Sequence, residues 1–161
     1  MSDLTHLNER GEARMVDVTS KDVTTREATA RCRVTVSAEV ADLLSAGQMP
    51  KGDALAVARI AAIQATKRTP DLIPLCHPIA VHGVDVDVTL MEESGSHAVE
   101  VLATVRTADR TGVEMEALTA AAVGGLTVID MVKGKDRSAA IAEVVLLEKK
   151  GGRSGHWVRE S

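Results

Sequence analysis

The residues with the clearest chemical potential lie in the apolar segment 112–135, GVEMEALTAAAVGGLTVIDMVKGK. At about 100° per residue, a helix places Glu116, Thr119 and Asp130 in one narrow sector of its surface. Lys133 follows Asp130 by three residues, so the two side chains meet on a helix. Because buried charges are costly unless they are paired or used, this pair at the end of an apolar helix indicates proton transfer. The alternative is an ordinary ion pair, with Lys133 complementing the helix C-terminus.

A second candidate is the histidine in the loop DLIPLCHP (71–78), where Pro74 and Pro78 restrict the backbone. Histidine titrates closest to neutrality, so His77 suits proton transfer or contact with a phosphate. A hydrogen-bonded structural histidine is the alternative. Cys76 could be a thiol nucleophile, but neighbours in an extended loop point in opposite directions. The sequence therefore disfavours a Cys–His dyad.

Three basic residues stand beside the ends of predicted elements. Lys51 precedes a long predicted helix, and helix N-termini present free N–H groups that bind anions. Lys51 would strengthen such an anion site. The alternative is an ordinary solvated lysine. Arg26 begins one predicted strand and Lys149 ends another, each with the parity of the apolar face. Both could reach a ligand at the sheet edge, or be frayed, exposed ends.

Hydrophobic periodicity predicts the elements that position these residues. Period-two alternation or sustained apolarity predicts strands over 15–19, 26–36, 84–90, 98–106 and 139–150, the last buried on both faces, and helices over 38–46, 53–68 and 112–134. Asp53 is the expected N-cap of the second helix, and Thr111 and Glu114 stand at capping-box spacing before the third. From Arg26 the order is β-α-β-β-α-β, so we predict an α+β, ferredoxin-like fold. Its antiparallel sheet would carry the helices on one face.

The composition limits the class of protein. The chain has 161 residues, a net charge of −4, one Trp and no Tyr or Phe, and its 23 Ala and 21 Val supply most apolar side chains. The scarcity of rings argues against modules that stack nucleic-acid bases. No apolar run approaches the roughly 20 residues of a membrane span, and the charged start MSDLTHLNER predicts no secretory leader. We expect neither a nucleic acid nor a membrane as a partner.

The remaining signals concern organisation. No repeat or long linker interrupts the chain, which predicts a single domain over 1–161, with a flexible arm over 1–13 and a Gly-rich tail over 151–161. The two cysteines form no CxxC pair, which favours a reduced, cytoplasmic protein. No two histidines have HxxxH spacing, so no metal site is predicted. Gly124-Gly125 in mid-helix costs about 2 kcal/mol relative to alanines, which tight packing against another helix or subunit would explain.

The residues alone favour an enzyme acting on an anionic small molecule, with Lys, Arg and His side chains around one Asp. Two alternatives come from other classes. In a non-enzymatic, nucleotide-binding scaffold, Asp130→Ala would leave the cellular role unaffected. In a hydrolase that depends on Cys76, Cys76→Ser would abolish activity.

Four stretches resemble a known family: LTHLNERGEARMVDV, KGDALAVARIAAIQATKRTPDLIPLCHPI, TGVEMEALTAAAVGGLTVIDMVK and KKGGRSG. Together they span nearly the whole chain and closely resemble the molybdenum cofactor biosynthesis protein C family, the cyclic pyranopterin monophosphate synthases. The resemblance implies a ferredoxin-like subunit assembled as a homohexamer, a trimer of dimers. It implies a lyase that converts 3′,8-cyclo-7,8-dihydro-GTP to cyclic pyranopterin monophosphate and releases pyrophosphate. No metal or organic cofactor is implied.

The resemblance also assigns roles to the candidate residues. It implies catalytic roles for Asp130, Lys133, Lys51 and His77; substrate contacts from Leu75, Cys76, His77, Met115 and Glu116; and supporting site positions at Arg26, Glu114 and Lys149. Cations would stabilise the leaving pyrophosphate. Lys133 would be the general acid, with Asp130 tuning it or acting as a base. Since the residues come from many elements, we expect a site shared between subunits.

Overall fold

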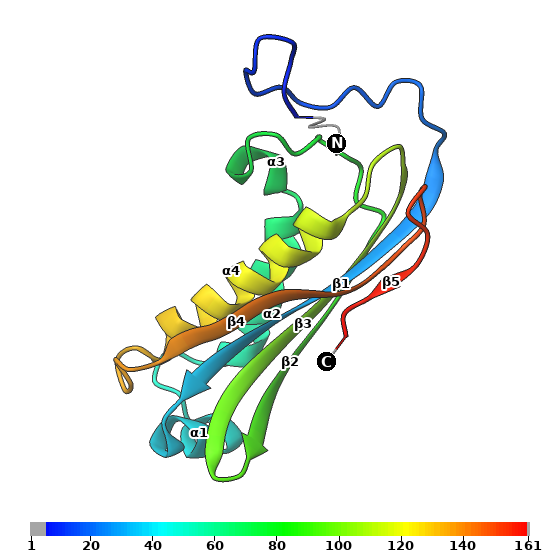
Figure 1. Cartoon of the computed structure of the whole chain (residues 1–161). Helices are drawn as coiled ribbons and strands as arrows, with labels where there is room; N and C mark the ends of the chain where they lie inside the picture. Colours follow the sequence, from blue (N-terminus) through cyan, green and yellow to red (C-terminus); the bar gives the residue numbers. More distant parts are fainter. Residues whose placement is uncertain (1–5, 161) are drawn as a thin grey trace.

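The alternating segment around Cys32 forms the central strand of a five-stranded antiparallel sheet. A computed structural model describes residues 6–160 (Figure 1). In chain order the elements are β1 (Thr24–Val36), α1 (Ala38–Ser45), α2 (Ala54–Thr66), α3 (Thr69–Leu72), β2 (Gly83–Glu93), β3 (Ser96–Asp109), α4 (Glu114–Val132), β4 (Ala140–Lys150) and β5 (Trp157–Val158). The sheet order is β2-β3-β1-β4-β5, with every neighbouring pair antiparallel. The first four strands have the predicted ferredoxin-like order, and the predicted fold class is confirmed.

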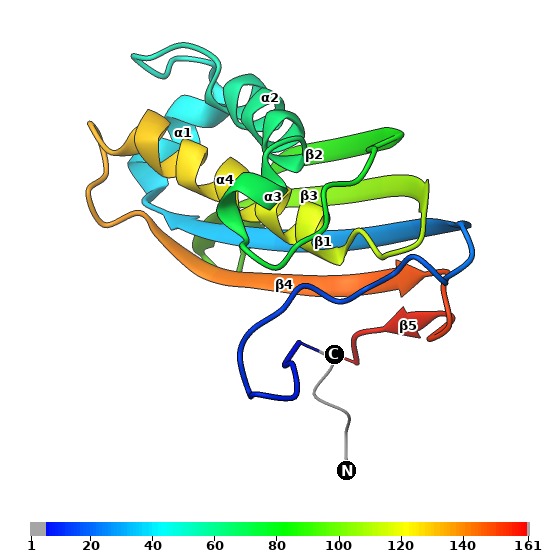
Figure 2. The same cartoon turned by 90° about the horizontal axis from the view of Figure 1, so that it is seen from above.

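All helices cover the same face of the sheet, as the view from above shows (Figure 2). The alternation in β1 directs Ala30, Cys32 and Val34 toward them, each fully buried, while Arg31 and Arg33 lie on the outer face. Alanine and valine make up most of the buried core. Because each of these side chains buries little area, the helices must lie close to the sheet.

The helix starts follow the capping residues in the sequence. Asp53 accepts a hydrogen bond from Ala56 N at 2.9 Å, as predicted for the N-cap of α2. Ser37 caps α1 through Val40 N. Thr69 and Pro70, expected to lie beyond the end of the long helix, begin the single turn α3. Proline is tolerated there because the first helical N–H needs no partner within the helix.

The paired glycines of α4 pack against other elements of the same chain. A Cβ atom on Gly125 would overlap Cys32 Sγ of β1, and one on Gly124 would lie 2.8 Å from a methyl group of Val101 in β3. The next neighbour of Gly124 is Ala62 of α2. The close approach predicted at these glycines is therefore made with the chain's own sheet as well as a helix. A second subunit is not required to explain them.

Helix α4 also corrects the expectation that no segment is apolar enough to span a membrane. Its 19 residues satisfy that criterion by length and composition. However, Ala117, Ala121, Val128 and five further apolar residues or glycines of the helix are buried, and the helix packs against the sheet and α2. α4 is a buried core helix.

Two strand predictions are wrong. Residues 15–19 form no strand, because the Val16 carbonyl oxygen accepts a hydrogen bond from His77 and no strand lies beside it. The last strand, β4, is not buried on both faces: no residue in it is fully buried, because helices cover only one face of the sheet. Residues 1–5 of the predicted arm lie outside the described residues. Residues 6–13 form a turn closed by a bridge between Leu7 and Ala13.

Candidate active site

The loop before β2 and the first turn of α4 line a cavity of about 410 Å³. Its lining comprises His6, Val16, Val18, Lys21, Leu75, Cys76, His77, Thr111, Gly112, Glu114 and Met115. Five of the predicted site residues therefore meet here, although they come from two segments up to 40 positions apart in the sequence. Leu75 and Met115 are the apolar side chains of this group, and each is 37% exposed. They offer an apolar surface to a bound ring.

The imidazole of His77 is held in a defined orientation. Its Nε2 lies 2.6 Å from the carbonyl oxygen of Val16. A carbonyl oxygen only accepts, so Nε2 carries the proton and donates it. In the neutral ring Nδ1 is then the acceptor. The ring can accept a proton at Nδ1, or donate from it when protonated.

The half-buried Cys76 in the cavity lining contacts the buried Glu116. The thiol donates to Oε1 of Glu116 at 3.5 Å, and Glu116 is only 1% exposed. Burial raises the pKa of the Glu116 carboxyl, and burial together with Glu116 raises the pKa of the Cys76 thiol to about 11. Cys76 is therefore a thiol at neutral pH, and the thiolate is the nucleophilic form. This geometry opposes a cysteine-dependent mechanism.

Glu114 does not close a capping box. The N-cap of α4 is Val113, and no side chain caps it. The Glu114 carboxylate instead folds over Gly112 and pairs with Lys149 of β4 at 3.2 Å. An ion pair to another element has replaced the local cap, which the spacing of Thr111 and Glu114 could not reveal.

Arg26 lies beside this ion pair. Its Nε donates to the carbonyl oxygen of Asp109 at 2.9 Å, and one Nη donates to that of Arg110 at 3.1 Å. Arg26, Glu114 and Lys149 line a narrow cleft adjoining the His77 cavity. Arg26 and Lys149 are thus held by contacts with other elements and are not frayed, exposed ends.

The other predicted catalytic residues form a second cluster. Asp130 accepts from Lys133 Nζ at 2.7 Å and from Lys51 Nζ at 3.2 Å. These contacts lower the pKa of Asp130, the one with Lys133 more than the one with Lys51. All three side chains are about half exposed. The cluster is therefore open to a ligand or to another chain.

Lys51 does not form an anion site at the start of α2, where Asp53 already caps the helix. Its ammonium group donates to the carbonyl oxygen of Asp130 at 2.7 Å, near the C-terminal end of α4. A cation in that position complements the negative end of the helix dipole.

The two clusters lie at opposite ends of α4. Glu114 is its first residue and Asp130 stands 16 positions later, which corresponds to about 24 Å at 1.5 Å per residue. Figure 1 shows the start of α4 near α3 and its end near the connection to β4. One chain does not bring Asp130 and His77 to the same ligand.

Two basic residues were missed by the sequence reasoning. Lys21 lines the His77 cavity, and together with Arg153 it lines a neighbouring cavity beside Arg26. Lys21 belongs to a segment without regular structure and Arg153 to the Gly-rich tail, so neither had a periodic pattern to mark it. Among residues 6–160, no group of three or more His, Cys, Asp or Glu side chains could hold a metal ion.

A ferredoxin-like fold with an ion-paired Asp–Lys cluster and a histidine-lined cavity has the residues of an acid–base enzyme for an anionic substrate. The chain belongs to the MoaC family, whose sequence model matches residues 15–152. It is 60% identical over 156 residues to the cyclic pyranopterin monophosphate synthase of Streptomyces avermitilis, covering 97% of this chain and 89% of the relative.

Further relatives carry the same description. The protein of Roseiflexus castenholzii is 58% identical over 160 residues, 99% of this chain and 100% of its own. The cyclic pyranopterin monophosphate synthase 2 of Mycobacterium bovis is 54% identical over 157 residues, 98% of this chain and 92% of its own. A likeness to the extracellular region of zebrafish Gpr126/Adgrg6 has a TM-score of 0.33 at 12% identity, over 81% of this chain and 15% of that one. It bears on neither fold nor function.

Proposed function

We propose that this chain is a cyclic pyranopterin monophosphate synthase of molybdenum cofactor biosynthesis. It converts 3′,8-cyclo-7,8-dihydro-GTP to the cyclic monophosphate and releases pyrophosphate. The observation that carries the proposal is identity of 54–60% along nearly the whole chain to enzymes of that name. The Asp–Lys pair, the oriented histidine and the cationic cleft are the groups that such a reaction uses.

The phosphate step defines what these groups must do. A hydroxyl oxygen of the substrate attacks the α-phosphorus, the bond from that phosphorus to the bridging oxygen breaks, and pyrophosphate leaves. The hydroxyl proton passes to a base, for which Nδ1 of His77 is free to accept. Arg26 and Lys149 are placed to stabilise the developing negative charge.

Ring opening and closure require further proton transfers, which we assign to Lys133. Its ammonium group donates to Asp130 at 2.7 Å. The lowered pKa of Asp130 keeps that carboxyl ionised at neutral pH, where it orients Lys133. Of the two roles considered for Asp130, this favours tuning of the lysine over action as a base. Lys51 supports the same carboxylate from the other side.

We further propose that the complete site is shared between subunits of a homohexamer, a trimer of dimers, in the cytoplasm. The distance of about 24 Å along α4 between the two clusters supports sharing, because one ligand the size of a nucleotide cannot touch both in one chain. A second chain that placed its Asp130 end against the His77 end of the first would complete two equivalent sites.

The test is incubation of the purified chain with the cyclic GTP-derived substrate, with separate assays for pyrophosphate and the pterin. We expect equal amounts of both products. Cys76→Ser should lose little activity, whereas a cysteine-dependent hydrolase would lose all of it. Asp130→Ala should abolish turnover, and an unchanged rate would favour the non-enzymatic scaffold.

A further inference from the structure

One buried carboxylate has no part in the site described above. Asp136 lies in the loop from α4 to β4 and is only 6% exposed. No lysine, arginine or histidine within residues 6–160 forms an ion pair with it. A buried carboxylate is costly unless other groups compensate its charge. The contacts of Asp136 therefore need a physical reason.

Three hydrogen bonds satisfy the carboxylate of Asp136. Its Oδ1 accepts from the backbone N–H of Ser138 at 2.8 Å and from the Ser138 hydroxyl at 2.6 Å. Its Oδ2 accepts from the backbone N–H of Ser37 at 2.8 Å. These bonds hold the pKa of Asp136 below its ordinary value, the one from the Ser138 hydroxyl most of all. One oxygen thus shapes the loop itself, and the other reaches a distant segment.

The bond to Ser37 joins the loop after α4 to the start of α1. Ser37 is the N-cap of α1, and its hydroxyl accepts from Val40 N at 3.3 Å. A weaker contact joins the same two segments, because Lys135 lies 3.8 Å from Glu39 in the first turn of α1. Asp136 therefore fixes the start of α1 relative to the end of α4.

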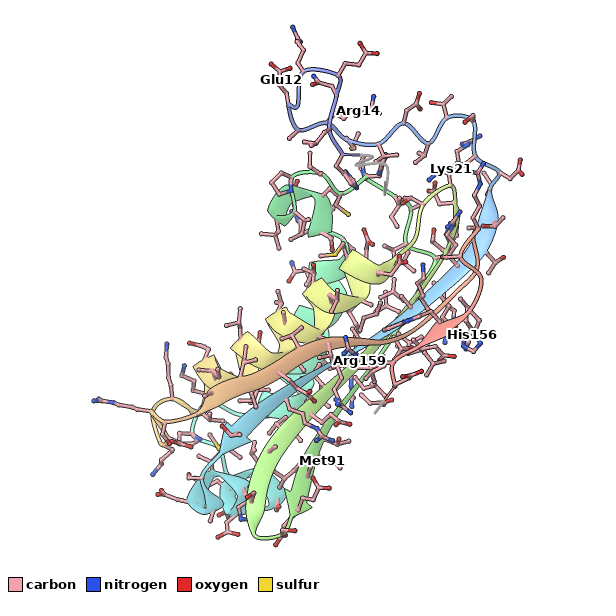
Figure 3. The ribbon with its side chains drawn as sticks, viewed as in Figure 1. Glu12, Arg14, Lys21, Met91, His156 and Arg159 are labelled. Carbon is pink, nitrogen blue, oxygen red and sulfur yellow. The ribbon has the colours of Figure 1, made fainter. Side chains whose placement is uncertain are left out.

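The figures show where this connection lies. The loop after α4 lies next to α1 in both views of the ribbon (Figure 1, Figure 2). Arg14 and Lys21, which mark the segment before β1, lie at the opposite end of the molecule (Figure 3). The connection is therefore at the Asp130 end of α4 and remote from the His77 cavity.

Lys51 makes a second connection between the same two parts of the chain. It stands in the turn that follows α1, and its ammonium group donates to the carbonyl oxygen of Asp130 at 2.7 Å and to the carboxylate at 3.2 Å. The chain thus closes a ring with two junctions. One junction is the bond between Ser37 and Asp136, and the other is the contact between Lys51 and Asp130.

Both segments of this ring are held by backbone hydrogen bonds. On one side α1 is followed by bonds from Gly47 N and Gln48 N back to the helix. On the other side Lys133 N, Lys135 N and Asp136 N donate to carbonyl oxygens of the last turn of α4. A displacement at one junction is therefore transmitted to the other, because neither segment can absorb it without losing hydrogen bonds.

We propose that Asp136 is a positioning residue, which fixes α1 to the end of α4 and thereby holds Lys51 against Asp130. Because Asp130 orients Lys133, this contact sets the geometry of the proton transfer assigned to that lysine. The inference rests on the proposed function and adds to it a residue that forms no ion pair with either lysine. Misplacement of a reacting group by about 1 Å can cost roughly 10²-fold in rate.

The first test measures the pKa of Asp130 by NMR of ¹³C-labelled aspartate carboxyls, which requires no substrate. Asp130→Asn identifies the signal. Lys133 and Lys51 lower this pKa in the wild type, so Lys51→Met should raise it. Asp136→Asn should raise it as well, and the variant that combines Asp136→Asn with Lys51→Met should show no further rise.

The asparagine opens the junction without a change of side-chain size. The two donors of Ser138 hold the oxygen of the new amide on their side, so its NH₂ group, which cannot accept, faces Ser37 N. Loss of the negative charge at position 136 would by itself lower the pKa of Asp130. A rise therefore reports displacement of Lys51 and not the change of charge.

Other variants separate positioning from stability. Ser138→Ala removes one hydrogen bond of the same carboxylate but leaves the bond to Ser37, so it should lower Tm and keep the wild-type pKa of Asp130 and the wild-type kcat. Ser37→Pro opens the junction from the other side, since the φ of −70° at Ser37 suits proline. It should raise the pKa of Asp130, whereas Ser37→Ala, which removes only the cap, should not.

Kinetics of the full chain connect the junction to the reaction. We expect Asp136→Asn to lower kcat and kcat/KM together, by up to about 10²-fold, because it disturbs an interaction needed in the transition state. A lower Tm with the wild-type pKa of Asp130 would show that Asp136 only supports the fold. A raised pKa with the wild-type kcat would equally overturn the proposal.

The outcomes distinguish this proposal from the proposed function. If the wild type does not turn the substrate over, the function fails, while the NMR titration still decides whether Asp136 holds Lys51 against Asp130. If the wild type turns over and the pKa of Asp130 is the same in Asp136→Asn, the function stands and the positioning role is wrong. If Asp136→Asn does not fold, Ser37→Pro decides by the same measurement.

Discussion

Lys51 Nζ lies 3.2 Å from Oδ2 of Asp130 and donates at 2.7 Å to the carbonyl oxygen of the same residue. The two contacts attach the turn before α2 to the last turn of α4, where helical carbonyl groups lack partners within the helix. With Lys133 on its other oxygen, Asp130 lies between two cations. A carboxylate so placed serves to hold and orient the lysines, because its pKa lies below the ordinary range.

Replacement of Lys133 by arginine tests whether this residue acts through its positive charge or by transferring a proton. Lys133→Arg keeps a cation beside Asp130 but does not release a proton near neutral pH. We expect Lys133→Arg and Lys133→Met to lose roughly 10²–10⁴-fold in kcat, with little change in Tm because the pair is exposed. Lys135→Met is the matched control, since the one ion pair of Lys135 within residues 6–160 is with Glu39 at 3.8 Å. A Lys133→Arg variant with nearly full kcat would show that only the charge matters.

Mixed oligomers test whether two chains build each site. His77→Ala damages one end of the subunit and Lys133→Ala the other, so each variant alone should be inactive. In a dimer of one variant with the other, one of the two sites carries both intact groups. Co-expression in equal amounts should then restore about a quarter of wild-type activity, because half of the dimers are mixed. No recovery in chains shown to co-purify would place both groups in a site made by one chain.

The comparison of β4 with its sequence shows what periodicity can and cannot predict. Strict alternation places Lys149 on the same face as Val145 and Leu147. Two bulges in the pairing with β1 instead put Val144 opposite Cys32 and Lys149 opposite Ala28, both on the helix side. Lys149 lies on the predicted face, but the residues of β4 that share this face with it are not the predicted ones. A bulge arises from the pairing between two strands, so the alternation within one strand does not reveal it.

The candidate site likewise contains one contact that the sequence predicts and others that it does not. The contact of Asp130 with Lys133 is local, and helical spacing was enough to predict it. Glu114 with Lys149, and Lys51 with Asp130, join residues 35 and 79 positions apart. Such contacts depend on how the elements pack, which propensity and capping rules do not specify. The spacing of Thr111 and Glu114 even suggested a different partner for the glutamate.

The buried Glu116 carboxyl should make stability depend on pH. Burial raises its pKa above the ordinary 4.5, so the folded chain keeps this proton to a higher pH than the unfolded chain does. Over that interval the folded state binds more protons, and stability falls as the pH rises. Glu116→Gln removes the titration, so the variant should gain stability relative to the wild type from pH 4.5 upward.

Urea unfolding of both proteins across that pH range measures the difference. Glu92→Gln, which changes an exposed carboxyl of β2, is the matched control. A stability difference between Glu116→Gln and the wild type that stays constant with pH would mean that folding does not raise the pKa of Glu116.

The close packing of α4 on the sheet predicts a steric penalty at Gly125. Gly125→Ala improves helix propensity by about 1 kcal/mol, but its methyl group would overlap Cys32 Sγ. Overpacking of this kind costs about 1–3 kcal/mol, so we expect a net loss of stability in urea unfolding. Gly134→Ala is the control, because nothing lies within 4 Å of its Cβ position.

Removal of the sulfur tests the cause of that loss. Cys32→Ala alone leaves a small cavity and should destabilise the fold. Combined with Gly125→Ala it frees the space that the new methyl group needs, so the double variant should be more stable than the sum of the two single losses predicts. Strict additivity would show that the two side chains do not compete for the same space, and that the glycine is retained for another reason.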